Sequence, residues 1–191
     1  MQPRLVLASA SPRRAQILTG LGIPFRIVVS DVDESIGPDE EGAAAAERLA
    51  RKKAEAVARK EELPVLAADT VVLCEGLVLG KPASPEDAAR MLRMLSGRRH
   101  DVVTGVCVAA AGALRSGIER TSVSFAPMTD EQVAWYVATG EPMDKAGAYH
   151  VDGIGSAFVA SLSGSPSNVA GLPVRLVLRL AREAGLSLGL P

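Results

Sequence analysis

The chain has 191 residues, 48% of them apolar, and a formal net charge of −1. This length and apolar content predict a proper hydrophobic core, and we expect one chain-wide domain over residues 1–191. The near-zero charge excludes a general attraction to nucleic acid or to an anionic membrane surface, so any anion site must be local. No apolar stretch approaches the roughly 20 residues of a membrane span, and a signal peptide's ordered regions are missing. We therefore expect a cytoplasmic protein.

The first element along the chain is an apolar run at residues 5–8 that predicts a buried strand and is followed at once by a helix. Pro12 suits the first helical position because its missing N–H would have no partner there, and Ser11 is a natural N-cap. The free N–H groups of the helix start, together with Arg13 and Arg14, would suit a polyphosphate. A capped helix with two solvated arginines is the structural alternative.

Further along, segments typical of strands and helices alternate. The expected strands cover residues 24–30, 65–73, 77–79, 100–110, 117–125 and 157–162, and the expected helices cover 13–21, 39–62, 85–95, 128–140 and 173–184. Residues 140–156 are rich in loop-forming residues, and 164–168 predict a turn. The alternation favours an α/β layer arrangement.

Asp69 is the sharpest chemical signal, because it interrupts the apolar strand expected at residues 65–73. A carboxylate in such a place is costly unless it is paired, metal-bound or at a strand end that faces a cleft. An Asp bonded to nearby backbone is the structural alternative. Thr70 would present its hydroxyl to the opposite face of a regular strand.

Two lysines come next in interest. Lys81 lies in a tight turn between Gly80 and Pro82, which would hold it better for a phosphate than a mobile helix face would. A solvated turn residue is the alternative reading. Lys53 lies on a charged helix where we expect most such side chains to be exposed.

Glu34 follows Asp31 and Asp33 in an acidic loop, and clustered carboxylates can hold Mg²⁺ or Mn²⁺. The sequence has no His/Cys spacing typical of a zinc site, no phosphate-binding glycine-rich motif and no nucleophile elbow. Cys74 and Cys107 lie in apolar runs and predict buried free thiols. These observations favour metal-assisted attack on an anionic substrate over covalent catalysis.

The motifs resemble those of the Maf family of nucleoside triphosphate pyrophosphatases, over nearly the whole chain and in the matching order. They are Leu7-Ala8-Ser9-Ala10-Ser11-Pro12-Arg13-Arg14, Ala68-Asp69-Thr70-Val71-Val72, Leu79-Gly80-Lys81-Pro82, Met94-Leu95-Ser96-Gly97, Gly140-Glu141-Pro142-Met143-Asp144-Lys145-Ala146-Gly147-Ala148-Tyr149 and Val169-Ala170-Gly171-Leu172-Pro173.

The resemblance implies a fold like that of the inosine triphosphate pyrophosphatases, an elongated mixed sheet flanked by helices in two lobes with a central cleft. It implies hydrolysis of dTTP and UTP to the monophosphate and pyrophosphate with a divalent metal cation, Mg²⁺ or Mn²⁺. Members of the family are often homodimers, are taken to remove non-standard nucleotides, and in some cases are linked to septum formation. Neither nucleic acid nor membrane is an expected partner.

The resemblance also assigns site residues. Asp69 matches the proposed proton acceptor, which would activate the attacking water directly or through the metal. Glu34 would help Asp69 to hold that metal. The triphosphate would be bound by Ser11, Arg13, Arg14, Lys53 and Lys81.

Three positions are taken to set the base specificity of the dTTP/UTP subgroup, where they are Arg, Thr and Gln. Arg13 and Thr70 agree with this pattern, but Asp152 stands where the subgroup has Gln. An ionised Asp can only accept hydrogen bonds, whereas Gln can also donate. Asp152 therefore leaves room for a substrate that presents donors, such as a modified cytidine or guanine nucleotide. Two other hypotheses stay open: a pyrophosphatase of the same family selective for another nucleotide such as 7-methyl-GTP, and a non-catalytic nucleotide-binding regulator of cell division.

Overall fold

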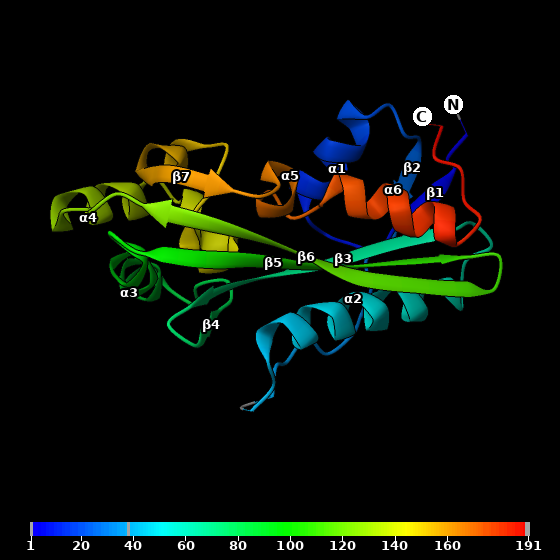
Figure 1. Ribbon diagram of the computed structural model, residues 1–191, viewed down its shortest axis with the longest axis horizontal. Helices are drawn as coiled ribbons and strands as arrows, with labels where there is room; N and C mark the ends of the chain where they lie inside the picture. The colour runs from blue at the N-terminus through cyan, green and yellow to red at the C-terminus, as the bar shows by residue number, and fades with distance from the viewer. Residues whose placement is uncertain (1, 38, 190–191) are drawn as a thin grey trace. The chain divides into compact units, whose positions relative to one another are not determined.

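The computed structural model describes residues 2–37 and 39–189 and contains a mixed α/β fold (Figure 1). Within these residues the sheet has seven strands in the order β2-β1-β3-β5-β6-β7, with β4 paired to β3. β1 is parallel to β2 and β3, whereas the β3–β4 and β6–β7 pairs are antiparallel. The strands are β1 (Leu5–Leu7), β2 (Phe25–Ile27), β3 (Val65–Cys74), β4 (Leu77–Leu79), β5 (Arg99–Ala110), β6 (Ala113–Phe125) and β7 (Val159–Ser163). The expected mixed sheet flanked by helices is confirmed.

The α-helices are α1 (Pro12–Gly20), α2 (Gly42–Ala58), α3 (Pro85–Leu95), α4 (Asp130–Ala138), α5 (Pro166–Val169) and α6 (Val174–Glu183). Three 3-10 helices follow α4 within the described residues: η1 (Glu141–Asp144), η2 (Ala146–Ala148) and η3 (Ile154–Phe158). No helix in the described part of the chain is both long and apolar enough to cross a membrane.

The chain divides into two compact units, each built from separate segments. Unit 1 comprises Met1–Asp69, Thr104–Glu119 and Gly171–Pro191, and unit 2 comprises Thr70–Val103 and Arg120–Ala170. Strands β3, β5 and β6 therefore each contribute residues to both units.

Unit 1 buries both faces of its strands, which explains the continuous apolar runs in the sequence. α1 and α6 cover one face and α2 covers the other (Figure 1). Successive side chains of a strand point to opposite faces. The first face accordingly presents Leu5, Leu7, Leu66 and Ala68, and the second presents Val6, Ala8, Val65 and Ala67.

Gly105 of β5 lets α2 come very close to the sheet. A Cβ at this position would lie 2.2 Å from the backbone oxygen of Ala46 and 2.5 Å from the backbone nitrogen of Glu47. These are backbone atoms of α2, so only a shift of the helix could make room. The glycine therefore fixes the distance between α2 and the strand beneath it.

Unit 2 has its own core, in which α3, α4 and the 3-10 helices pack against the strands. Both helix starts carry the expected caps. Ser84 Oγ accepts a hydrogen bond from the Asp87 amide at the start of α3. Thr129 and Gln132 form a reciprocal capping box at the start of α4. Such caps satisfy amides that have no partner inside the helix.

Several predicted boundaries were wrong. α2 runs from Gly42 to Ala58, not over 39–62, and the Lys60 amide bonds to the Val57 carbonyl in a closing turn. β6 begins at Ala113, before Gly117. A Cβ added at Gly117 would make only ordinary van der Waals contacts. Three 3-10 helices begin within the segment 140–156, β7 begins at Val159, and the expected turn at 164–168 overlaps the short helix α5. Propensity alone does not identify such short, tertiary-supported turns.

The prediction for the two cysteines is confirmed. Cys74 and Cys107 are buried free thiols. Burial raises the pKa of both, that of Cys107 to about 12, so neither is a ready nucleophile.

Candidate active site

The centre of the candidate site in unit 1 is the ammonium group of Lys53, which contacts two carboxylates. Lys53 Nζ lies 2.6 Å from Asp69 Oδ1 and 2.8 Å from Glu34 Oε2. Lys53 and Asp69 are buried, whereas the Glu34 side chain is 56% exposed. The buried carboxylate is thus compensated by an ion pair, which is what makes its burial tolerable.

The alternation of β3 and the helical repeat of α2 bring these groups together. Asp69 continues the series Val65, Ala67 that faces α2. Lys53 lies one helical turn from Ala50 and Val57, on the buried stripe of α2. The expectation that Lys53 would be exposed with the charged face of the helix was wrong. Its spacing from Ala50 and Val57 is the sequence signal that places it on the inner face.

Arg14 is a second buried cation in unit 1. Its Nε donates to the Gly171 carbonyl at 2.8 Å and its Nη1 donates to Ser9 Oγ at 3.0 Å. Burial lowers the pKa of the Arg14 guanidinium, and the nearby carboxylates of Asp69 and Glu34 act in the opposite sense. A guanidinium stays protonated in proteins, so Arg14 is a fixed positive charge in the same electrostatic neighbourhood as the carboxylate pair.

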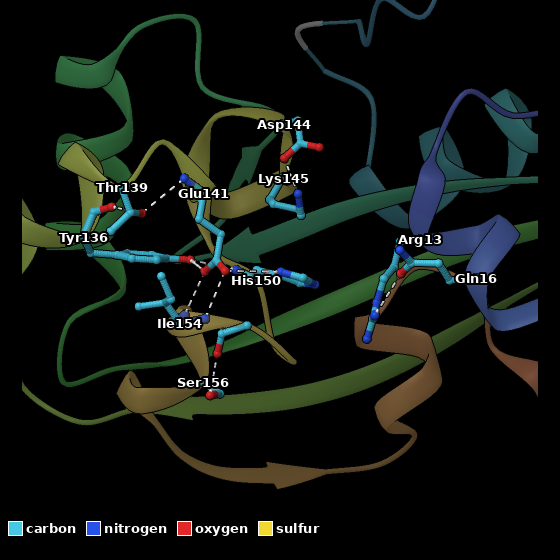
Figure 2. A network of polar contacts seen from close by, with 12 residues as sticks. Arg13, Gln16, Tyr136, Thr139, Glu141, Asp144, Lys145, His150, Ile154 and Ser156 are labelled. Atoms are coloured by element: carbon cyan, nitrogen blue, oxygen red, sulfur yellow. Dashed lines mark hydrogen bonds and ion pairs between the residues drawn. The ribbon is translucent and has the colours of Figure 1, made fainter. Parts of the chain in front are cut away.

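The helix start next to Arg14 departs from the expected cap. Ser11 is the N-cap of α1, but its side chain makes no capping bond within the described residues, and its amide donates to Ser9 Oγ at 3.2 Å. Ser9 Oγ therefore accepts from both Ser11 and Arg14. Arg13 Nη1 donates to Gln16 Oε1 at 3.2 Å (Figure 2).

The two carboxylates fit the donor set that Mg²⁺ uses at phosphate sites. Such ions are held by one or two carboxylates, with the remaining positions filled by water and substrate phosphates. Glu34 and Asp69 supply such a pair, because both contact the same ammonium group. In the described residues no group of three or more His, Cys, Asp or Glu side chains forms a complete protein-only metal site.

The other predicted site residues lie in unit 2. Lys81 is exposed directly after β4, Thr70 is half-buried on β3, and Asp152 is exposed in the loop that follows Tyr149.

That loop is held by a residue whose role the sequence did not reveal. Glu141 accepts hydrogen bonds from the Tyr136 hydroxyl and from the amides of Ile154 and Gly155 (Figure 2).

A family described as Maf-like protein matches residues 4–184. A protein of Anaeromyxobacter sp. (strain Fw109-5) named dTTP/UTP pyrophosphatase is 51% identical over 187 residues, which cover 95% of this chain and 90% of the relative. A protein of Moorella thermoacetica with the same name is 51% identical and covers 96% of each chain.

The fold is also found among solved structures. The Ham1 protein of Staphylococcus aureus superposes with a TM-score of 0.50 over 94% of this chain and 93% of that one. Its sequence identity is 17%, so the likeness concerns the fold alone.

Proposed function

The chain belongs to the Maf-like protein family, and on this basis we propose that it is a pyrophosphatase that hydrolyses dTTP and UTP to the nucleoside monophosphate and pyrophosphate. The observation that carries the proposal is the sequence identity of 51%, over nearly the full length, to two relatives named dTTP/UTP pyrophosphatase. The cluster of buried charges in unit 1 supports it, because an enzyme that cleaves a phosphoanhydride needs a general base and fixed cations.

Asp69 is the proposed general base. The carboxylate would take a proton from the water that attacks the phosphoanhydride between the α and β phosphates. Its ion pair with Lys53 at 2.6 Å supports this role by holding the side chain in one orientation. A base fixed in place needs no reorganisation when the water attacks.

The cations Arg14 and Lys53 are proposed to bind the triphosphate and to stabilise the charge that builds on the pyrophosphate leaving group. Arg14 is held by Ser9 and Gly171, so its guanidinium is positioned before substrate arrives. Ser11, Arg13 and Lys81 are assigned to phosphate binding, and Arg13, Thr70 and Asp152 to base specificity, by the matching of motifs alone.

Glu34 and Asp69 would hold a divalent cation, Mg²⁺ or Mn²⁺. Such an ion, when bound, supplies positive charge beside the phosphates. Lys53 contacts both carboxylates, so it already provides one counter-charge to the pair.

The proposal is tested by measuring pyrophosphate release with Mn²⁺ from dTTP, UTP, CTP and 7-methyl-GTP. We expect kcat/KM for dTTP and UTP to exceed that for the other two by about tenfold or more, since a base-reading site discriminates by unpaired polar groups. The Asp69→Asn variant, purified in the same way, controls for contaminating phosphatases. Failure to turn over any of the four would contradict the enzymatic proposal.

One observation favours a second candidate substrate. Asp152 is exposed, and a carboxylate, which only accepts hydrogen bonds, prefers a base edge that donates them. Turnover confined to CTP or 7-methyl-GTP in the same panel would favour this alternative over dTTP and UTP.

A further inference from the structure

The carboxylate of Glu141 binds the loop at residues 149–155 through several separate contacts. Glu141 is the first residue of η1, and its Oε1 accepts from the Ile154 amide at 3.0 Å. Its Oε2 accepts from the Gly155 amide at 2.9 Å and from the Tyr136 hydroxyl at 2.7 Å. His150 Nδ1 lies 3.5 Å from Oε1 (Figure 2). All these residues belong to unit 2.

The pKa of the Glu141 carboxyl is lowered although its side chain is largely buried. The side chain is 18% exposed, and this burial acts to raise the pKa of the carboxyl. The hydrogen bonds from Tyr136, Ile154 and Gly155 act in the opposite sense, and the pKa is lowered overall. Hydrogen bonds to an ionised acceptor are about twice as strong as those between neutral groups.

Two glycines show that the loop is closely fitted around this carboxylate. A Cβ at Gly153 would lie 2.1 Å from Glu141 Oε1 and 2.5 Å from His150 Nδ1. A Cβ at Gly155 would lie 2.5 Å from the Tyr136 hydroxyl oxygen. Any larger residue at either place would push the loop away from Glu141 and Tyr136.

The other end of the loop is held by an aromatic cluster. Tyr149 is buried, its hydroxyl lies 3.0 Å from His100 Nε2, and its ring packs edge-on against Phe125 at a centroid distance of 4.8 Å. The Tyr136 hydroxyl also accepts from the His150 amide at 3.0 Å, next to Tyr149. Both ends of the loop are therefore fixed, and Asp152 lies exposed between them.

We propose that Glu141 is a positioning residue that fixes the 149–155 loop and, through it, presents Asp152 to the base of the nucleotide. The part of this inference that concerns Asp152 and the nucleotide base rests on the proposed function. The anchoring of the loop is independent of substrate.

The test compares Glu141→Gln with the wild-type chain. Gln keeps the size of the side chain but replaces one acceptor oxygen by an NH₂ group. This NH₂ is itself a donor, so it cannot accept a hydrogen bond from a backbone N–H or from the Tyr136 hydroxyl. We expect the amides of Ile154 and Gly155 to exchange with solvent about tenfold faster or more. Glu131→Gln is the matched control, because it makes the same atomic change at an exposed position on α4.

The kinetic readout separates positioning from general damage. We expect the KM for dTTP in Glu141→Gln to rise about tenfold, a loss of the size expected for misplaced polar contacts. The inhibition constant of inorganic triphosphate, which has no base, should stay within about twofold of wild type. Parallel increases in both constants would overturn the inference, because the effect would then not be specific to the base side.

Unchanged exchange of Ile154 and Gly155 in Glu141→Gln would overturn the anchoring whatever the activity. A wild-type chain that hydrolyses neither dTTP nor UTP would instead contradict the proposed function. Gly153→Ala provides a second perturbation that keeps Glu141, and it should reproduce the faster exchange of both amides. If Gly153→Ala leaves that exchange at the wild-type rate, the close fit of the loop around Glu141 is refuted.

Discussion

The Asp69 carboxylate is the single group on which turnover should depend most strongly. We expect Asp69→Asn to retain nucleotide binding and to reduce kcat by about 10²- to 10⁴-fold, because an amide cannot accept the proton of the attacking water. Binding is measured by calorimetry with dTTP, and turnover by pyrophosphate release. Asp39→Asn changes an exposed carboxylate in the same way and should behave as wild type. Wild-type turnover in Asp69→Asn would exclude Asp69 as the base.

Asp152 is the residue at which base preference should respond. We expect Asp152→Gln to increase the ratio of kcat/KM for dTTP to that for CTP by about tenfold, because Gln both donates to and accepts from a pyrimidine edge. The ratio is measured by competition of the two substrates in one reaction. A ratio that does not change would show that this position does not select the base here.

At the scale of elements, the contact between α2 and β5 should control both stability and activity. We expect Gly105→Ala to lower the free energy of unfolding by about 1 to 3 kcal/mol, because the added methyl group overlaps backbone atoms of α2. The same shift would move Lys53, which lies on α2, away from Asp69. Urea unfolding and pyrophosphate release measure the two effects.

Gly20→Ala is the control for Gly105→Ala. Gly20 ends α1, and nothing lies within 4 Å of the Cβ that an alanine would add. This variant should be neutral or stabilised by up to about 1 kcal/mol. Equal stability losses in the two variants would mean that the close approach of α2 is not what Gly105 serves.

The sequence predicted elements better than it predicted the partners of their side chains. The strands of unit 1 are short apolar runs, and the caps at Ser84 and Thr129 are strong local signals, so these elements were found. The contacts of Lys53 and Glu141 could not be predicted from the sequence, because each is a charged residue whose burial depends on a distant segment. Local propensity carries no information about such long-range pairs.

At the scale of the whole molecule, the stability of the chain should fall in mild acid. Burial lowers the pKa of His100 to about 4, while the Asp101 carboxylate acts in the opposite direction. In the unfolded chain a histidine has a pKa of about 6.5. Between pH 6.5 and pH 4 the unfolded state therefore binds a proton that the folded state does not, and the free energy of unfolding decreases as the pH falls.

The measurement is urea unfolding at pH 7 and pH 4.5. We expect this histidine to account for about 2 to 3 kcal/mol of the loss. His100→Gln removes the titrating group while keeping a polar partner for the Tyr149 hydroxyl. Between pH 7 and pH 4.5 the free energy of unfolding of this variant should therefore fall by about 2 to 3 kcal/mol less than that of the wild-type chain. An equal loss in both chains would assign the pH dependence to other groups.

The interleaving of the two units along the chain has a consequence for synthesis. Unit 1 draws on Met1–Asp69 and on Gly171–Pro191, whereas unit 2 lies wholly between these two segments. Helix α6 contributes Leu176, Val177 and Leu180 to the core beneath α1. On the ribosome, the core of unit 1 therefore cannot be completed until α6 has been synthesised, which happens only after all of unit 2. We expect nascent chains stalled before α6 to leave part of the apolar face that α1 and α6 share uncovered and to depend on chaperones for that interval.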